Sequence, residues 1–133
     1  MKKFYSSVDT LIPSPLSEQH LLIKNKAEQE NGAITAYASE EFRTVAHQPW
    51  IFNKLNETPG IDGVIFFTAT QFLYGNSFNL KLFKKILDHN YEIHFARENL
   101  SFSKQKNDIK ELDFLILHSL VFHKKEQELF EII

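Results

Sequence analysis

The chain has 133 residues, of which 43% are hydrophobic, and a formal net charge of −2. A chain of this length and composition folds around one core, so we expect residues 1–133 to form a single domain without extensive disorder. The chain has no cysteine, which excludes disulfide scaffolds, thiolate metal sites and cysteine nucleophiles. Proteins that bind nucleic acid through bulk charge are basic, so the charge balance disfavours that class.

The sequence also disfavours membrane insertion and export. No apolar stretch approaches the roughly 20 residues of a membrane span, and polar residues interrupt the segment after Lys2 and Lys3, unlike in a signal peptide. We therefore expect a cytoplasmic protein without a membrane span. Its thirteen phenylalanines predict either a crowded core or a buried partner surface.

The first third of the chain predicts two strands separated by a helix. Residues 3–8 carry bulky side chains typical of a strand, and a proline-containing loop follows them. Ser17 is suited to cap a helix that ends at Asn31-Gly32, since glycine tolerates the left-handed conformation of a helix end. Residues 33–39 alternate weakly, which indicates a second strand, and the polar residues 40–48 indicate a loop.

The middle of the chain predicts a short helix and a central strand. Pro49 suits the first turn of the helix, and Pro59-Gly60 ends it. Residues 61–68 form a nearly continuous apolar run, which is typical of a strand covered on both faces. Residues 70–76 are expected to form a loop.

The last part of the chain predicts a helix, a strand and a second, longer helix. The first helix is expected to start at Asn76 or Ser77 and to end at Asn90, because apolar side chains between them recur at helical spacing. Residues 91–96 form the fourth predicted strand. A long C-terminal helix is expected within residues 104–133, opening at Asn107 or the residue after it.

Strands that alternate with helices in this way imply a parallel sheet with right-handed crossovers. We therefore predict a three-layer α/β domain. Its sheet is expected to have four parallel strands in the order 2-1-3-4, numbered along the chain.

Polar residues follow the four predicted strands, where open parallel sheets bind their ligands. We expect a small polar ligand to bind there, in one pocket lined by Ser6, Ser7, Gln19, Glu40, Thr68, Gln71 and Glu98. The simpler alternative is that strand ends continue into loops, and loops are polar. None of the four glycines belongs to a GxGxxG or GxxxxGKS/T loop, and His118 and His123 do not share a helix face, so we expect no cofactor and no metal.

The sequence leaves open whether this pocket is catalytic. Glu40 and Glu98 are candidates for a general acid–base pair, although exposed carboxylates are more often merely solvated. Ser7, or its neighbour Ser6, is a candidate nucleophile, but a serine needs a base nearby. Among the histidines, His47 is the one near a predicted strand end.

The last helix carries apolar side chains on nearly all sides between residues 109 and 122. A helix that is apolar on every side is buried on every side, and one sheet face cannot cover it. We therefore expect a homo-oligomer, a dimer in the simplest case, that pairs through this helix. The alternative is that the helix crosses its own sheet.

The layout resembles the catalytic domain of serine recombinases of the resolvase type. Residues 4–10 stand where that family has its Y-x-R-V-S-T strand, and the long C-terminal helix mediates dimerisation in that family. The chemistry differs, because Asp9 occupies the position of the nucleophilic serine and Ser7 that of an arginine. Residues 69–73 replace the L-D-R-L motif, so the resemblance implies a fold without recombinase activity and without specific DNA binding.

Several segments also resemble the sporadic carbohydrate cluster protein family, small proteins encoded among bacterial surface-polysaccharide genes. The segment at residues 59–65, Pro-Gly-Ile-Asp-Gly-Val-Ile, matches best, and Gln71 follows it. Further matches are Ser6-Ser7, Gln19 with the helix after it, Glu40, and His94-Phe95-Ala96 with Glu98. This resemblance implies an accessory protein or a small-sugar enzyme in surface-polysaccharide biosynthesis. The alternative is an inactive recombinase-like module that acts through protein or DNA contacts.

Overall fold

The structure, a computed structural model, describes residues 1–10, 12, 14–40, 50–74, 77–105, 111–118, 120–121 and 124. The elements follow the predicted alternation of strands and helices in the first part of the chain and depart from it after residue 69. In chain order they are β1 (Lys2–Asp9), α1 (Leu16–Gln29), β2 (Gly32–Glu40), α3 (Trp50–Glu57), β3 (Gly63–Phe66), the 3-10 helix η1 (Ala69–Phe72), β4 (Leu73–Tyr74), β5 (Ser77–Phe78), α4 (Leu80–Asp88), β6 (Glu92–Phe95) and β7 (Leu100–Phe102).

The main sheet has five strands in the order β2-β1-β3-β6-β7. The first four strands of this order run parallel, and β7 pairs antiparallel with β6. The expectation of an α/β fold with a mostly parallel sheet is confirmed, and the predicted count of four strands is wrong. The reason is the turn at residues 96–99, where Asn99 adopts a left-handed φ of 55° and reverses the chain within four residues.

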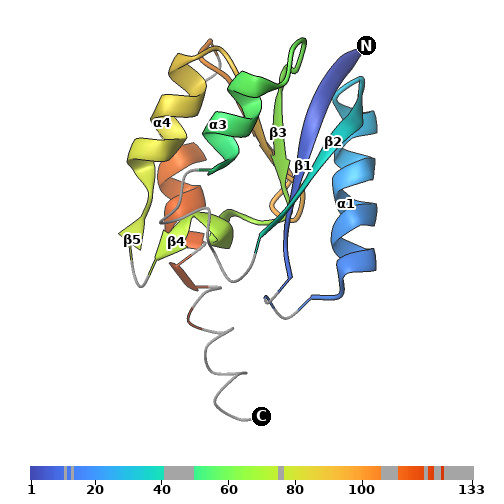
Figure 1. Cartoon of the computed structure of the whole chain (residues 1–133). Coiled ribbons are helices and arrows are strands. Elements are labelled where there is room, and N and C mark those ends of the chain that lie inside the picture. Colours follow the sequence, from blue (N-terminus) through green and yellow to red (C-terminus); the bar gives the residue numbers. More distant parts are fainter. Residues whose placement is uncertain are drawn as a thin grey trace.

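Helices cover both faces of this sheet, which gives the expected three layers (Figure 1). On one face, Phe4 and Val8 of β1 pack against Ile23 and Ala27 of α1. On the other face, α3 and α4 enclose a larger cluster. The phenylalanines form a crowded core there, through ring contacts that join Phe66, Phe72, Phe78, Phe83, Phe95 and Phe102.

The segment predicted as a loop at residues 70–76 is more regular than expected. It contains η1 and then a two-stranded ladder in which Leu73 pairs with Phe78. Because residues 77 and 78 belong to this ladder, α4 does not start at Asn76 or Ser77. It starts at Leu80, where the Asn79 side chain accepts a hydrogen bond of 3.1 Å from the Leu82 amide.

Part of the predicted C-terminal helix lies within the described residues. Residues 111–118 are helical, and Leu112 and Leu115 are buried against the larger cluster. Lys104 and Gln105 form a bend, and the predicted helix start at Asn107 or the residue after it lies outside the described residues. Residues 125–133 lie outside the described part of the chain. In the described segments, no helix is long and apolar enough to cross a membrane.

Candidate functional site

Four of the seven predicted pocket residues meet at the carboxyl ends of β1, β3 and β6. Gln71 Nε2 donates to the Ser7 carbonyl and hydroxyl oxygens at 3.3 and 3.4 Å, and Gln71 Oε1 accepts from the Thr68 amide at 3.0 Å. The Thr68 hydroxyl donates to Glu98 Oε2 at 2.8 Å. The structure therefore brings Ser7, Thr68, Gln71 and Glu98 into one hydrogen-bonded chain.

The Glu98 carboxylate accepts a hydrogen bond from the backbone at the start of η1. Its Oε1 accepts from the Ala69 amide at 3.1 Å, and its Oε2 lies 3.6 Å from Arg97 Nε. Only 3% of the Glu98 side chain is exposed. Both carboxylate oxygens are thus engaged inside the protein, which fixes the turn after β6 to the start of η1.

Gln19 holds a different loop. Its Oε1 accepts from the Asp9 amide at 3.0 Å, and its Nε2 donates to the Asp9 and Ser14 carbonyls at 2.9 and 3.0 Å. Gln19 is completely buried. All of these contacts are to the backbone between β1 and α1, so Gln19 holds this loop and does not belong to the Gln71 chain of hydrogen bonds.

Ser6 lies on the opposite face of the sheet from Ser7, because successive residues of a strand point to opposite faces. Its side chain is directed toward α1, and 1% of the residue is exposed. Among the described residues, Ser6 Oγ has no hydrogen-bond partner. The Glu40 backbone pairs with Asp9 at the end of β2, whereas the Glu40 side chain and His47 lie outside the described residues.

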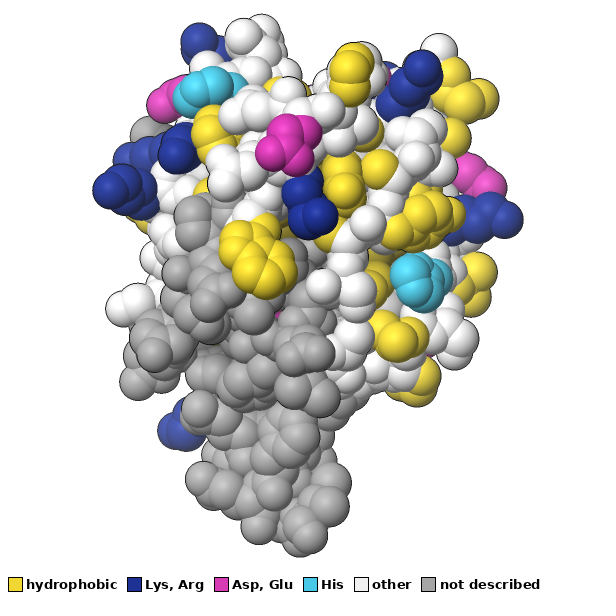
Figure 2. Space-filling model, viewed as in Figure 1, with side chains coloured by type: hydrophobic (Ala, Val, Ile, Leu, Met, Phe, Trp, Pro, Cys, Tyr) yellow, Lys and Arg dark blue, Asp and Glu magenta, His cyan; other side chains and the backbone are white. Residues whose placement is uncertain are grey.

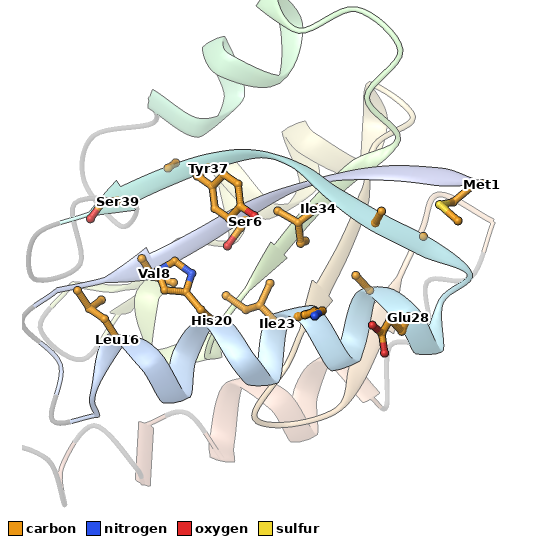
Figure 3. A pocket seen from close by; sticks show the side chains of 15 residues that line it. Met1, Ser6, Val8, Leu16, His20, Ile23, Glu28, Ile34, Tyr37 and Ser39 are labelled. Atoms are coloured by element: carbon orange, nitrogen blue, oxygen red, sulfur yellow. The ribbon is translucent and has the colours of Figure 1, made fainter.

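Ser6 faces a groove between α1 and β2 with a volume of about 860 Å³ (Figure 3). We call this the α1–β2 groove. Its floor is mostly apolar, with polar groups at a few places along it. The lining residues used below are Ser6, His20, Ile23, Ile34, Tyr37 and Ser39.

Two aromatic rings flank the mouth of the α1–β2 groove. The centroids of His20 and Tyr37 lie 6.1 Å apart in an edge-to-face arrangement. Tyr37 is 67% exposed, which is unusual for so large a side chain on a strand. Figure 2 shows hydrophobic side chains gathered over the part of the surface where Figure 1 places α1 and β2.

The aromatic residues of this groove were not predicted from the sequence. One signal was present, namely the small side chains on β2, where Ala33 and Ala38 line the groove. Small residues on a strand leave volume between the sheet and the helix that covers it. Ala27 on α1 adds to this volume from the other side, and it too lines the groove.

No protein-family model matches the chain, and no curated protein matches it. Within the described residues, no group of three or more His, Cys, Asp or Glu side chains is placed to hold a metal ion.

Proposed function

We propose that this protein binds a sugar in the α1–β2 groove and serves as a cytoplasmic accessory protein in bacterial surface-polysaccharide biosynthesis. The observation that carries the proposal is Ser6, whose buried hydroxyl faces the groove without a hydrogen-bond partner among the described residues. A buried polar group without a partner costs about 1–3 kcal/mol, and a ligand hydroxyl would remove that cost.

The groove offers the two kinds of contact that a sugar needs. A sugar ring presents C–H groups on its faces, and the exposed Tyr37 ring is a flat apolar surface for them. Its hydroxyls need donors and acceptors, which Ser6 and Ser39 supply. The volume also lies within the range of about 300–1,000 Å³ that is typical of small-molecule sites.

Sugar binding in the α1–β2 groove is better supported than catalysis in the predicted pocket at the carboxyl edge of the sheet. Ser7 is completely buried, and its oxygens accept from Gln71 rather than facing a general base. Glu98 is engaged by the Thr68 hydroxyl and the Ala69 amide. The proposed place in polysaccharide biosynthesis rests on the resemblance to the sporadic carbohydrate cluster protein family.

A recombinase-like module without activity is the second candidate function. The parallel order β2-β1-β3-β6 favours it, since this is the order we expected for a resolvase-like domain. Asp9, at the position of the nucleophile, is completely buried, which accords with the absence of strand-transfer chemistry. Salt-sensitive binding of duplex DNA in a mobility-shift assay would favour this candidate, whereas the proposed accessory protein does not bind duplex DNA specifically.

We propose further that two copies pair through the C-terminal helix. Leu112 and Leu115 face the core, whereas Phe114, Leu117 and Val121 are 62%, 65% and 48% exposed. These three positions are spaced by three and four residues, so they form one outward stripe. A second copy of the same stripe is the simplest surface that would cover it.

The experiment for sugar binding is a titration of ¹⁵N-labelled protein with glucose, galactose, N-acetylglucosamine and glucuronic acid. We expect amide shifts that cluster on α1 and β2 for at least one sugar. Tyr37→Ala should weaken that binding by up to about tenfold, because aromatic contacts are worth about 0.5–1.5 kcal/mol. Ser6→Ala should weaken it as well.

Trp50→Ala is the matched control, because Trp50 is an exposed aromatic residue on α3, away from the groove. It should leave the affinity unchanged. Amide shifts confined to the residues around Gln71 would instead indicate that the sugar binds in the predicted pocket at the carboxyl edge of the sheet. Absence of shifts with every sugar at millimolar concentration would contradict the proposed function.

A further inference from the structure

A second cavity lies beside β6 and β7, near the C-terminal end of α1. Its volume is about 350 Å³, and Glu30, Glu92, His94 and Ser101 are among the residues that line it. Glu30 directly follows α1, whereas Glu92 and His94 belong to β6 and Ser101 belongs to β7. None of them belongs to the α1–β2 groove.

Ser101, His94 and Glu92 form a continuous line. His94 Nδ1 lies 2.9 Å from Ser101 Oγ, and His94 Nε2 lies 3.0 Å from Glu92 Oε1. A carboxylate on one ring nitrogen holds the proton of the imidazole there and leaves the other nitrogen free to accept one. This is the arrangement of nucleophile, base and orienting group that activates a serine.

The Ser101 hydroxyl has two acceptors within reach. It donates to Glu30 Oε1 at 2.6 Å, and Glu30 Oε1 itself lies 3.5 Å from His94 Nδ1. Rotation about the Cβ–Oγ bond alone would turn the hydroxyl hydrogen from Glu30 to His94. The Glu30 carboxylate also raises the pKa of His94, which favours the protonated ring that forms as the serine oxygen attacks.

Other groups around His94 determine its protonation. Lys2 lies 3.0 Å from Glu92, and Lys26 lies 3.4 Å from Glu30, so each carboxylate has a lysine partner. The Phe4 ring packs edge-on against the imidazole at a centroid distance of 5.0 Å. Burial lowers the pKa of His94 below its ordinary value of 6.5, although Glu92 and Glu30 oppose this shift. At neutral pH the ring is therefore unprotonated, the form that accepts a proton.

We propose that Ser101 is a nucleophile toward small esters, with His94 as its general base and Glu92 as the residue that positions the ring. Ser101 Oγ forms a bond to the acyl carbon while its proton moves to His94 Nδ1. The ester C–O bond breaks, and the leaving alcohol takes that proton. Water then attacks the acyl-serine with His94 as base, which releases the carboxylic acid and returns the proton to Ser101.

The cavity determines the class of substrate. Its volume is at the lower end of the range for small-molecule sites, about 300–1,000 Å³, so it accommodates a short acyl group such as acetyl. Lys104 and Gln105 also line it and supply polar groups for the alcohol part of the ester. This activity is independent of the proposed sugar binding, because Ser6 and Tyr37 lie in the α1–β2 groove and not in this cavity.

The experiment incubates the purified full chain with p-nitrophenyl acetate, follows the release of nitrophenol and locates acetyl groups by mass spectrometry. We expect acetylation at Ser101 and a rate that decreases as pH falls through a single ionisation below 6.5. Ser101→Ala should abolish the acetylation and reduce the rate about 10²-fold, the lower end of the contribution of base-assisted attack. Ser17→Ala is the matched control, because Ser17 is an exposed serine on α1 that lines neither cavity, and it should retain both.

Glu92→Gln tests whether Glu92 positions the His94 ring. The measurement is the pH–rate profile, which a purely structural role of Glu92 would not change. Removal of the negative charge should move the inflection of the pH–rate profile to lower pH, because Glu92 raises the pKa of His94. Wild-type protein that stays unacetylated, or a rate that Ser101→Ala leaves unchanged, would overturn the proposal. Both outcomes are independent of the sugar titration, so failure of one proposal leaves the other intact.

Discussion

Two buried glutamines stabilise loops of this protein through hydrogen bonds to the backbone. Gln19 uses both ends of its amide on the backbone of Asp9 and Ser14, and Gln71 does the same for Thr68 and Ser7. An amide side chain carries a donor and an acceptor, so it can replace the hydrogen bonds that an irregular backbone cannot make with itself. These residues support the carboxyl edge of the sheet from within.

Gln19→Ala should therefore destabilise the protein. The substitution leaves the Asp9 amide and two carbonyl oxygens without their partner, at about 1–3 kcal/mol for each buried group that water does not reach. Urea unfolding followed by circular dichroism measures the change. Gln29→Ala is the control on the same helix, because Gln29 is exposed, and it should change the free energy of unfolding by less than about 0.5 kcal/mol. Equal effects of the two variants would contradict this role of Gln19.

Sequence reasoning placed Ser7, Thr68, Gln71 and Glu98 at one edge because the carboxyl ends of parallel strands lie together. It could not show that these groups bind one another. That depends on the turn at residues 96–99, which brings the Glu98 carboxylate over η1. Ser6 could have been separated from Ser7 by strand alternation alone, but only the structure shows that Ser6 Oγ has no hydrogen-bond partner among the described residues.

Among the elements, the long apolar runs and the helices with regular spacing were predictable, and the short pieces were not. The strand at residues 100–102 has three residues, too few for a periodic signal, and β4 and β5 have two each. Such strands form through pairing with a neighbouring strand and not through a pattern of their own, as β4 pairs with β5 and β7 with β6. The start of α4 was misplaced for the same reason.

We expect acid to destabilise the part of the structure where α1, β6 and β7 meet. Burial lowers the pKa of His94 in the folded chain, so the unfolded chain takes up this proton first as pH falls below 6.5. Stability is then lost on acidification. The pKa of Glu30 is also lowered from 4.5, because its hydrogen bond from Ser101 and the charges of His94 and Lys26 outweigh the opposing effect of burial. Its contribution is present above 4.5 and is lost at lower pH.

We therefore expect the urea midpoint of the wild-type protein to decrease between about pH 7 and pH 5.5. The variant His94→Gln has no ring to protonate there and should show a smaller decrease. His20→Gln, at an exposed position of α1, should show the full decrease. A wild-type midpoint that stays constant across this interval would contradict the role of His94.

For the whole molecule, we propose that the exposed stripe of the C-terminal helix determines the state of assembly. Phe114 and Leu117 are each more than half exposed, while the same helix contributes Leu112 and Leu115 to the core. Complete burial of a Leu or Phe side chain contributes about 1.5–3 kcal/mol. Pairing across a two-fold axis buries two stripes, one from each copy, which offsets the lower part of an association cost of about 4–15 kcal/mol.

Light scattering should therefore give twice the chain mass of 15.6 kDa at micromolar concentration. Phe114→Asp combined with Leu117→Asp places charge in the seam and should yield monomers that keep the wild-type circular dichroism, since neither side chain is buried in the core. Leu21→Asp is the matched control, because Leu21 is an exposed leucine on α1, and this variant should stay dimeric. A wild-type mass of 15.6 kDa would exclude the dimer, and dissociation by Leu21→Asp alone would move the interface from the C-terminal helix to α1.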